Sequence, residues 1–428
     1  MMARRAWRTP VALSVFLVPA CAWCQGDGLR AGVARVDITP SQPCMLSGYA
    51  SRTNLSTGVH DPLSARAVAF EHGGHRVVLV SSDIIGFYGD MAEHMRARIT
   101  AACGLRPDEL VLTAIHTHAA PTLTLEEGKL HPNNLKYTKV LRERLIAACQ
   151  AAITNLRPAR IRFGSGASPV GVNRREPYLD KAGNTQIRLG RNPAIPIDTE
   201  VQVLEIREIA GDRMTSALFA YATHSTSLGA KNLVVSGDVH GLAEQFVERH
   251  LGSGVIAAAF AGASGNVDPW FRVLPGIKTE NDWMPEPVLL GTMLGEEVVH
   301  TLGRTHDLGG DGPVASLIKT VELPAKTEPE KPPGAPTVPL TISVARVGDV
   351  AIVGLGAEVF NEIGRAIKDR SPFPHTMVVT HCNGGAGYLV LREAYAQGGY
   401  EVKTSPFAPE AAERVLRDID GMLAQLKE

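Results

Sequence analysis

The chain has 428 residues and a formal net charge of −1, with 44% hydrophobic and 20% charged residues. This composition is typical of a soluble globular protein that forms one large domain or two to three smaller ones. The nearly balanced charge argues against a nucleic acid as the partner.

Residues 1–25 are predicted to form an export signal. Three arginines precede a short apolar run over 11–19, and small residues suited to cleavage follow at 20–22. The run is too short for a membrane anchor. We therefore expect an exported protein, periplasmic or secreted. A lipoprotein signal with acylation at Cys21 is the alternative, and Pro19 disfavours it.

Strands and helices alternate along the rest of the chain. This order predicts an α/β fold, with layered mixed β-sheets flanked by helices in a single large domain over 26–428. Strands are predicted over 31–40, 65–70, 76–81, 109–115, 161–163, 201–209, 214–222, 255–260, 340–347, 350–355 and 377–380. Helices are predicted over 90–103, 135–156, 238–251, 287–303, 358–368 and 408–427. The Pro-rich segment 325–339 is expected to be an exposed loop within this domain.

Three of the apolar runs lead into side chains that can bind a metal or act in catalysis. The first leads into His116 and His118, the second into His224, and the third into a loop with Asp268. Strand residues two apart share a face, so His116 and His118 are expected to point the same way. Ligands of α/β proteins gather at the carboxyl ends of strands, so we expect one shared site, of which a metal site is one interpretation. The alternative for the first pair is two surface histidines near Pro121.

Four cysteines lie outside the signal region: Cys44, Cys103, Cys149 and Cys382. Their spacing contains no CxxC metal motif and no disulfide framework. We expect mostly buried thiols. A bridge between Cys103 and Cys149 remains open.

Several short motifs occur in an order that resembles the neutral/alkaline (non-lysosomal) ceramidase family. They lie at 32–40, 48–49, 59–60, 65–67, 116–118, 224–226, 236–238, 265–269 and 358, and at Tyr388, Tyr395, Tyr400 and Glu401. The resemblance covers nearly all of the chain from about residue 30 and rests on the ordered set. Enzymes of this family are zinc amidases that split the N-acyl bond of ceramide. The resemblance therefore implies a Zn²⁺ cofactor and a lipid amide substrate, which allows contact with a membrane surface.

The resemblance also implies a role for each matching residue. The positions that match the zinc ligands are His116, His224, Glu358 and Tyr388. His118 matches a histidine that handles protons, and Arg174 and Tyr400 match groups that contact the polar head of the substrate or the developing oxyanion. Zinc held by imidazole and carboxylate ligands keeps a position for water, which loses a proton near neutral pH and attacks the amide carbonyl.

Two departures from the family pattern bear on the mechanism. Asp268 stands where the family has a serine regarded as catalytic, so we predict no acyl-enzyme at this position. His118 or Asp268 would then be the base, and Asp268 binding a second cation is a further option. We also expect the catalytic domain alone, without the family's C-terminal immunoglobulin-like domain. Both departures, with Ala119-Ala120 in place of Ser-Gly, weaken the case for ceramide more than for a zinc hydrolase.

Each of these residues taken alone has a structural explanation. Glu358 suits the first turn of a helix, and Tyr388 suits a core. Arg174 can form a solvated pair with Arg175, and Asp268 can be a turn residue. Their joint order favours an exported, zinc-dependent amidohydrolase of the ceramidase type. The alternatives are a metallo-amidase or esterase with a non-lipid substrate, and a non-catalytic binding protein on the same scaffold.

Overall fold

The computed structural model of the chain describes residues 28–252, 254–271, 285–327 and 336–428. The predicted export signal and the middle of the Pro-rich segment lie outside the described residues, so both stay predictions. In the described part, no helix is sufficiently long and apolar to span a membrane.

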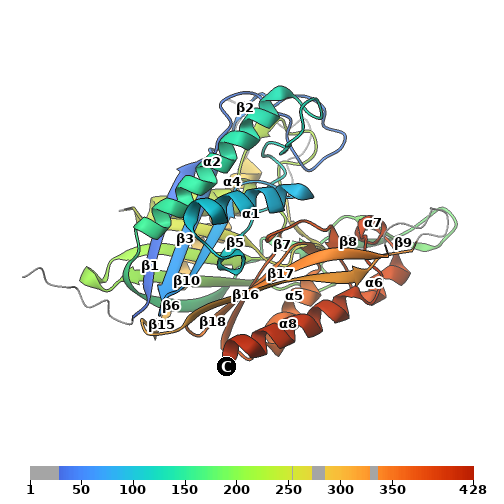
Figure 1. Ribbon diagram of the computed structural model, residues 1–428. Helices are drawn as coiled ribbons and strands as arrows, with labels where there is room; N and C mark the ends of the chain where they lie inside the picture. Colours follow the sequence, from blue (N-terminus) through green and yellow to red (C-terminus); the bar gives the residue numbers. More distant parts are fainter. Residues whose placement is uncertain (1–27, 253, 272–284, 328–335) are drawn as a thin grey trace, which may run out of the picture.

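A nine-stranded sheet forms the first layer of the fold (Figure 1). Its strand order is β13-β11-β10-β6-β1-β3-β4-β5, and β15 pairs with β6. The bounds are β1 Arg30–Asp37, β3 Ser64–His72, β4 His75–Ser82, β5 Leu110–Leu112, β6 Arg157–Ala167, β10 Glu200–Glu208, β11 Met214–Tyr221, β13 Ile256–Ala261 and β15 His306–Gly309. The predicted β3–β4 hairpin turns at Gly73 and Gly74, which both have positive φ, a conformation that glycine adopts without strain.

A four-stranded sheet packs against the first one. Its order is β16-β17-β18-β20, with β16 Val314–Pro324, β17 Thr337–Val347, β18 Val350–Leu355 and β20 His375–Val379. The core between the sheets joins side chains of the large sheet, such as Phe70 and Leu218, to Ile352 and Met377 of the small one. Every residue of β18 is buried, as expected for a strand that is covered on both faces.

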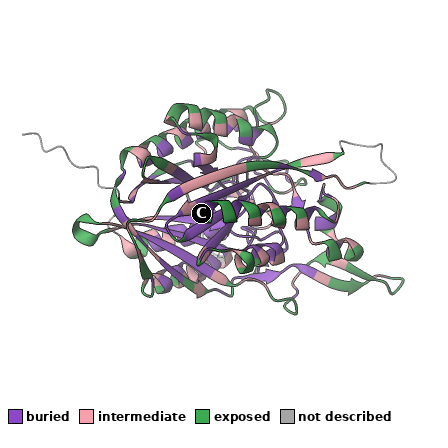
Figure 2. Ribbon diagram, turned by 60° about the horizontal axis from the view of Figure 1, so that its bottom comes forward, coloured by how far each residue is buried: buried purple, intermediate pink, exposed green. Residues whose placement is uncertain are grey.

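Helices cover the two outer faces of this pair of sheets (Figures 1 and 2). On the large sheet, α2 packs against β1 and β3, while α1 packs on α2, and α3 and α4 pack on each other and contact β13 and β10. On the small sheet, α5 and α8 contact β20, β16 and β17. The bounds are α1 Asp90–Cys103, α2 Pro132–Thr154, α3 Asp238–Leu251, α4 Pro285–Leu302, α5 Asn361–Arg370 and α8 Ala411–Lys427. The predicted layered α/β fold is therefore confirmed.

Short elements join the loops of the two sheets. They are β2 Gly58–Val59, β7 Gly171–Asn173, β8 Arg175–Leu179, β9 Thr185–Leu189, β12 Val234–Val235, β14 Val267–Pro269, β19 Glu358–Val359, β21 Tyr388–Leu389, α6 Arg392–Gln397, α7 Tyr400–Thr404 and the 3₁₀ turns η1 Pro107–Glu109 and η2 Ala210–Asp212. Three of the ladders pair distant segments: β2 with β12, β7 with β14, and β19 with β21.

Two local predictions are wrong. The strand predicted over 109–115 has only the three residues of β5, and His116 already has a positive φ of 60°. The shared-face argument for His116 and His118 therefore does not hold, although the two rings do meet. Glu358 does not begin a helix. It lies in β19, which pairs with β21, and α5 begins at Asn361.

The cysteine prediction is confirmed. All four thiols are free, and Cys103 is half-buried while the other three are buried. Cys103 and Cys149 are therefore not bridged in this structure.

Candidate metal centre

Three histidines and a glutamate converge at the end of the two sheets where the strand-end loops meet. Oε2 of Glu358 lies 3.5 Å from Nε2 of His116 and 3.4 Å from Nε2 of His224. Nε2 of His118 lies 3.2 Å from Nε2 of His116. One nitrogen from each of the three histidines lies within 4.8 Å of the other two, so these histidines could hold a metal ion.

Hydrogen bonds between the loops hold these residues together. Thr117 forms a parallel bridge with Ser225, which joins the loop after β5 to the loop after β11. Gly265 donates its backbone N–H to the Val359 carbonyl at 2.7 Å, which joins the loop after β13 to β19. The sequence-based expectation that the three strand ends meet is therefore realised in the fold.

The histidines are oriented by hydrogen bonds at their other ring nitrogen. Nδ1 of His116 lies 2.8 Å from the Ile85 carbonyl, and Nδ1 of His224 lies 2.8 Å from the Ser264 carbonyl. A carbonyl accepts, so each Nδ1 carries the proton and each Nε2 presents a lone pair. Metal-binding histidines are usually held by such a bond.

Glu358 brings an ionised carboxylate to these lone pairs. Burial by itself raises the pKa of Glu358, but positive charge on the neighbouring His116 and His224, when these rings are protonated, holds this pKa well below its usual range. Its Oε2 is buried and accepts no hydrogen bond from the described residues. Two imidazole lone pairs and a buried anionic oxygen that face one another fit a cation, and N and O donors are ligand types that zinc accepts.

Tyr388 and Arg174 complete this side of the centre. Tyr388 pairs with Glu358 across the β19–β21 ladder, and its hydroxyl accepts a hydrogen bond from Nη2 of Arg174 at 3.0 Å. Nη1 of Arg174 donates to Nε2 of His224 at 3.1 Å. The ring of Tyr400 meets that of Tyr388 edge-on at 5.8 Å and is 46% exposed, so Tyr400 is open to solvent.

The geometry separates the two candidate bases. Asp268 is fully buried, with Oδ1 3.2 Å from Nη1 of Arg174 and Oδ2 3.2 Å from Nη1 of Arg191. His118 is only half-buried, and its Nδ1 has no hydrogen-bond partner among the described residues. Burial and the neighbouring His116 hold the pKa of His118 well below its usual range, so its ring is neutral. The arrangement favours His118 as the base.

Two residues of the centre were not assigned a role from the sequence. His381 stacks on His116 with ring centroids 3.8 Å apart and planes 12° apart. It follows β20, so the strand-end pattern that identified His224 would have found it. Glu401 binds Arg174 and Arg175 at 2.8 Å each, and its sequence signal was its place in the ordered set of motifs, directly after Tyr400.

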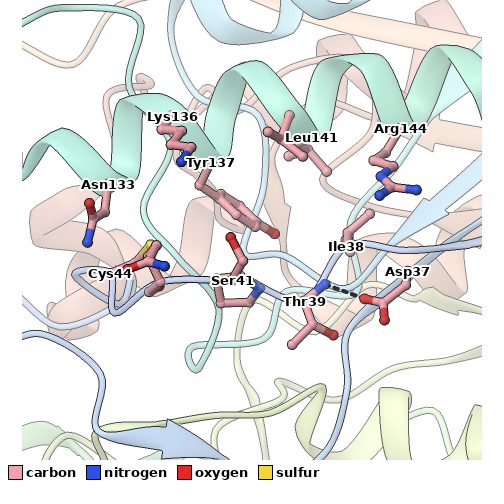
Figure 3. A pocket seen from close by; sticks show the side chains of 13 residues that line it. Asp37, Ile38, Thr39, Ser41, Cys44, Asn133, Lys136, Tyr137, Leu141 and Arg144 are labelled. Carbon is pink, nitrogen blue, oxygen red and sulfur yellow. Dashed lines mark hydrogen bonds between the residues drawn. The ribbon is translucent and has the colours of Figure 1, made fainter.

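A cavity of about 460 Å³ lies beside His118. Its apolar wall includes Met45, Leu46, Met91 and Leu123, and its Tyr49 ring contacts the His118 ring at 5.1 Å between centroids. A second cavity of about 250 Å³ lies between α2 and residues 37–44 (Figure 3), and no residue of the metal centre lines it. Of these two cavities, the first is the one next to the candidate chemistry.

The sequence profile described as "Neutral/alkaline non-lysosomal ceramidase, N-terminal" matches residues 29–271, which is more than half of the chain. The chain belongs to this family. The predicted resemblance is thus confirmed. Glu358, Tyr388, Tyr400 and Glu401 lie beyond the matched region.

Relatives of this ceramidase-family chain occur in plants, animals and bacteria. Neutral ceramidase from Oryza sativa is 27% identical over 51% of this chain and 28% of its own length. Neutral ceramidase from Drosophila melanogaster is 28% identical over 56% of this chain and 36% of its own length. Neutral ceramidase from Mycobacterium tuberculosis is 23% identical over 59% of this chain and 40% of its own length. The chain thus matches less than half the length of these relatives.

Solved structures share the fold. Neutral ceramidase from Pseudomonas aeruginosa superimposes with a TM-score of 0.76 at 20% identity, over 94% of this chain and 74% of that one. A ceramidase complexed with C2 superimposes with a TM-score of 0.77 at 19% identity, over 94% of this chain and 75% of that one. At this identity the similarity establishes the fold alone.

Proposed function

We propose that the protein is an exported, zinc-dependent amidohydrolase that cleaves the N-acyl amide bond of ceramide-like lipids. The observation that carries this proposal is the meeting of two oriented imidazole lone pairs with the unpartnered, buried oxygen of Glu358. Family membership supports the amide bond as the target.

His116, His224 and Glu358 would hold the zinc ion, with the Tyr388 hydroxyl beside them. When bound, zinc supplies a Lewis acid and a water of lowered pKa. His118 takes the proton of the attacking water and returns it to the leaving amine. Arg174 and Tyr400 donate hydrogen bonds to the negative charge that grows on the carbonyl oxygen.

The cavity beside His118 supports a lipid amide as substrate. Its apolar wall suits an acyl or alkyl chain, whereas a small polar substrate would need a polar pocket. Hydrolysis proceeds by direct attack of water, because a carboxylate stands at position 268. No acyl-enzyme should therefore form, and mass spectrometry during turnover should find no covalent adduct on a Ser or Cys side chain.

The experiment is metal analysis joined to a substrate panel of N-acyl sphingoid bases, N-acyl amino acids and esters. We expect one zinc per chain and cleavage of the lipid amides. His116→Ala and His224→Ala should lose both metal and activity, whereas His75→Ala, at an exposed turn, should keep both. Full activity of the metal-free protein would refute the proposal.

A further inference from the structure

The guanidinium of Arg174 is held by four hydrogen bonds to other side chains. Its Nε donates to Glu401 at 2.8 Å, and its Nη1 donates to Asp268 at 3.2 Å and to His224 at 3.1 Å. Its Nη2 donates to Tyr388 at 3.0 Å. A guanidinium has five N–H donors, so one, on Nη2, has no partner among the described residues.

One of these four bonds is incompatible with a bound metal. Nδ1 of His224 is committed to the Ser264 carbonyl, so Nε2 has a single lone pair. Arg174 now uses that lone pair, and a metal ion on Nε2 would take it. The guanidinium would then lose a hydrogen bond and stand beside a second positive charge. Its place must be secured by other contacts.

Two buried carboxylates supply those contacts. Glu401 is fully buried and bridges Arg174 and Arg175. Asp268 is fully buried as well and bridges Arg174 and Arg191. They approach Arg174 from α7 and β14, so each fixes a different nitrogen of the fork. Charge-assisted bonds of this kind are about twice as strong as neutral ones and direct the planar group.

We propose that Asp268 and Glu401 are positioning residues that anchor Arg174 and neutralise its charge beside the metal. This inference rests on the proposed function of the site. Asp268, at the position of the family serine, acts through Arg174 and does not itself touch the reacting atoms. The unpartnered Nη2 donor of Arg174, next to the Tyr388 hydroxyl, is then available for the developing oxyanion.

The first test is a double-mutant cycle on the zinc-loaded protein with an N-acyl lipid substrate. Asp268→Asn should lower kcat by about 10- to 100-fold with little change in KM, which is the typical cost of losing a residue that orients the groups around a metal. In an Arg174→Ala background the same change should cost less than about threefold, because residues that act through one another are not additive. Losses that multiply would overturn the inference, since they would mean that Asp268 acts on its own.

The second test needs no turnover and so separates this inference from the proposed function. Arg174→Ala leaves a guanidinium-sized space between the two carboxylates, and millimolar guanidinium chloride should raise its melting temperature. The double variants Arg174→Ala/Asp268→Asn and Arg174→Ala/Glu401→Gln should lose this stabilisation. No stabilisation of Arg174→Ala would overturn the anchor even in a protein that binds zinc. Stabilisation in a protein without zinc or turnover would retain the anchor and reject the proposed function.

Glu205 offers a matched control. It is a buried carboxylate between Arg162 at 3.2 Å and Arg207 at 2.6 Å, and it also accepts a hydrogen bond from Thr305; none of these three residues belongs to the metal centre. Glu205→Gln should lower stability but leave kcat, KM and zinc affinity as in the wild type. A fall in kcat equal to that of Asp268→Asn would show a merely structural effect and overturn the inference.

Discussion

Among the described residues, two buried arginines, Arg174 and Arg66, each pair with more than one buried carboxylate, and only Arg174 lies in the candidate active site. Arg174 meets Asp268 and Glu401 at the metal centre. Arg66 on β3 is equally buried and pairs with Glu244, with Glu248 at 3.1 Å and with Asp83 at 3.6 Å. We refer to these two groups as the Arg174 cluster and the Arg66 cluster.

The clusters differ in what their carboxylates face. In the Arg66 cluster, each carboxylate also accepts from a backbone N–H: Glu244 from Ala259 at 2.7 Å, Glu248 from Ala257 at 3.1 Å and Asp83 from Ser64 at 2.7 Å. The cluster thereby ties α3 to β13, β3 and β4. Beside the Arg174 cluster, by contrast, Oε2 of Glu358 faces Nε2 of His116 and Nε2 of His224 and accepts no hydrogen bond from the described residues. The convergence of metal-binding acceptors on one point therefore marks the site more clearly than buried charge does.

The largest expected effect is the loss of metal in Glu358→Gln. The amide keeps the volume of the side chain but removes the charge that holds the cation. Mutation of a residue that only hydrogen-bonds to a metal ligand typically lowers metal affinity by roughly 10- to 100-fold. The loss of zinc affinity in Glu358→Gln should be larger, and activity should fall with it. Chelator competition measures the affinity. The metal-free variant should be as stable as metal-free wild type or more so, because it no longer buries an ionised carboxylate. Unchanged zinc affinity would remove Glu358 from the ligand set.

Glu244→Ala should give the opposite result. It leaves Arg66 with one carboxylate fewer in a fully buried place, and such changes cost about 3–5 kcal/mol of unfolding free energy. Zinc affinity and kcat per folded molecule should stay near the wild-type values. Urea unfolding measures the loss, and Glu244→Gln, which keeps an acceptor for Ala259, should lose less. Lost metal affinity in the folded variant would mean that the two clusters are coupled.

Much of the fold and several residues of the candidate site were within reach of the sequence. Local periodicity predicted α1 and α3 with the bounds that the structure has, and the Gly73-Gly74 pair predicted the β3–β4 turn. Strand ends and motif order identified His116, His224 and Glu358. The helix assigned to Glu358 was wrong because β19 forms only by pairing with β21, a contact that local pattern does not encode.

The ion pairs were out of reach for a similar reason. Arg175 and Glu401 are 226 residues apart, and nothing in their local sequence marks them as partners. The same holds for Arg66, whose carboxylate partners on α3 lie in a different part of the chain. Distinguishing the Arg66 cluster from the Arg174 cluster therefore required coordinates.

The smallest expected effect concerns His240, which lies on α3 in the same helix as Glu244. Its Nδ1 lies 2.8 Å from the Ser225 hydroxyl and its Nε2 3.2 Å from the Tyr221 carbonyl, so the neutral ring is fully hydrogen-bonded. Burial lowers the pKa of His240 to about 4. The unfolded chain binds this proton near pH 6.5, so the unfolded state holds more protons between these values. Stability should therefore rise with pH over this window, and His240 contributes at most about 3 kcal/mol to the rise.

His240→Gln should flatten this part of the profile. Urea unfolding of the metal-free protein between pH 4.5 and 7.5 measures it, with the exposed His75→Gln as a control that keeps the wild-type slope. The comparison uses the difference between the two variants, because other buried histidines add to both slopes equally. An identical slope in His240→Gln would mean that the native protein protonates His240 without cost. The surroundings of the His240 ring, between α3 and the metal centre, would then be more polar than the two hydrogen bonds of this ring indicate.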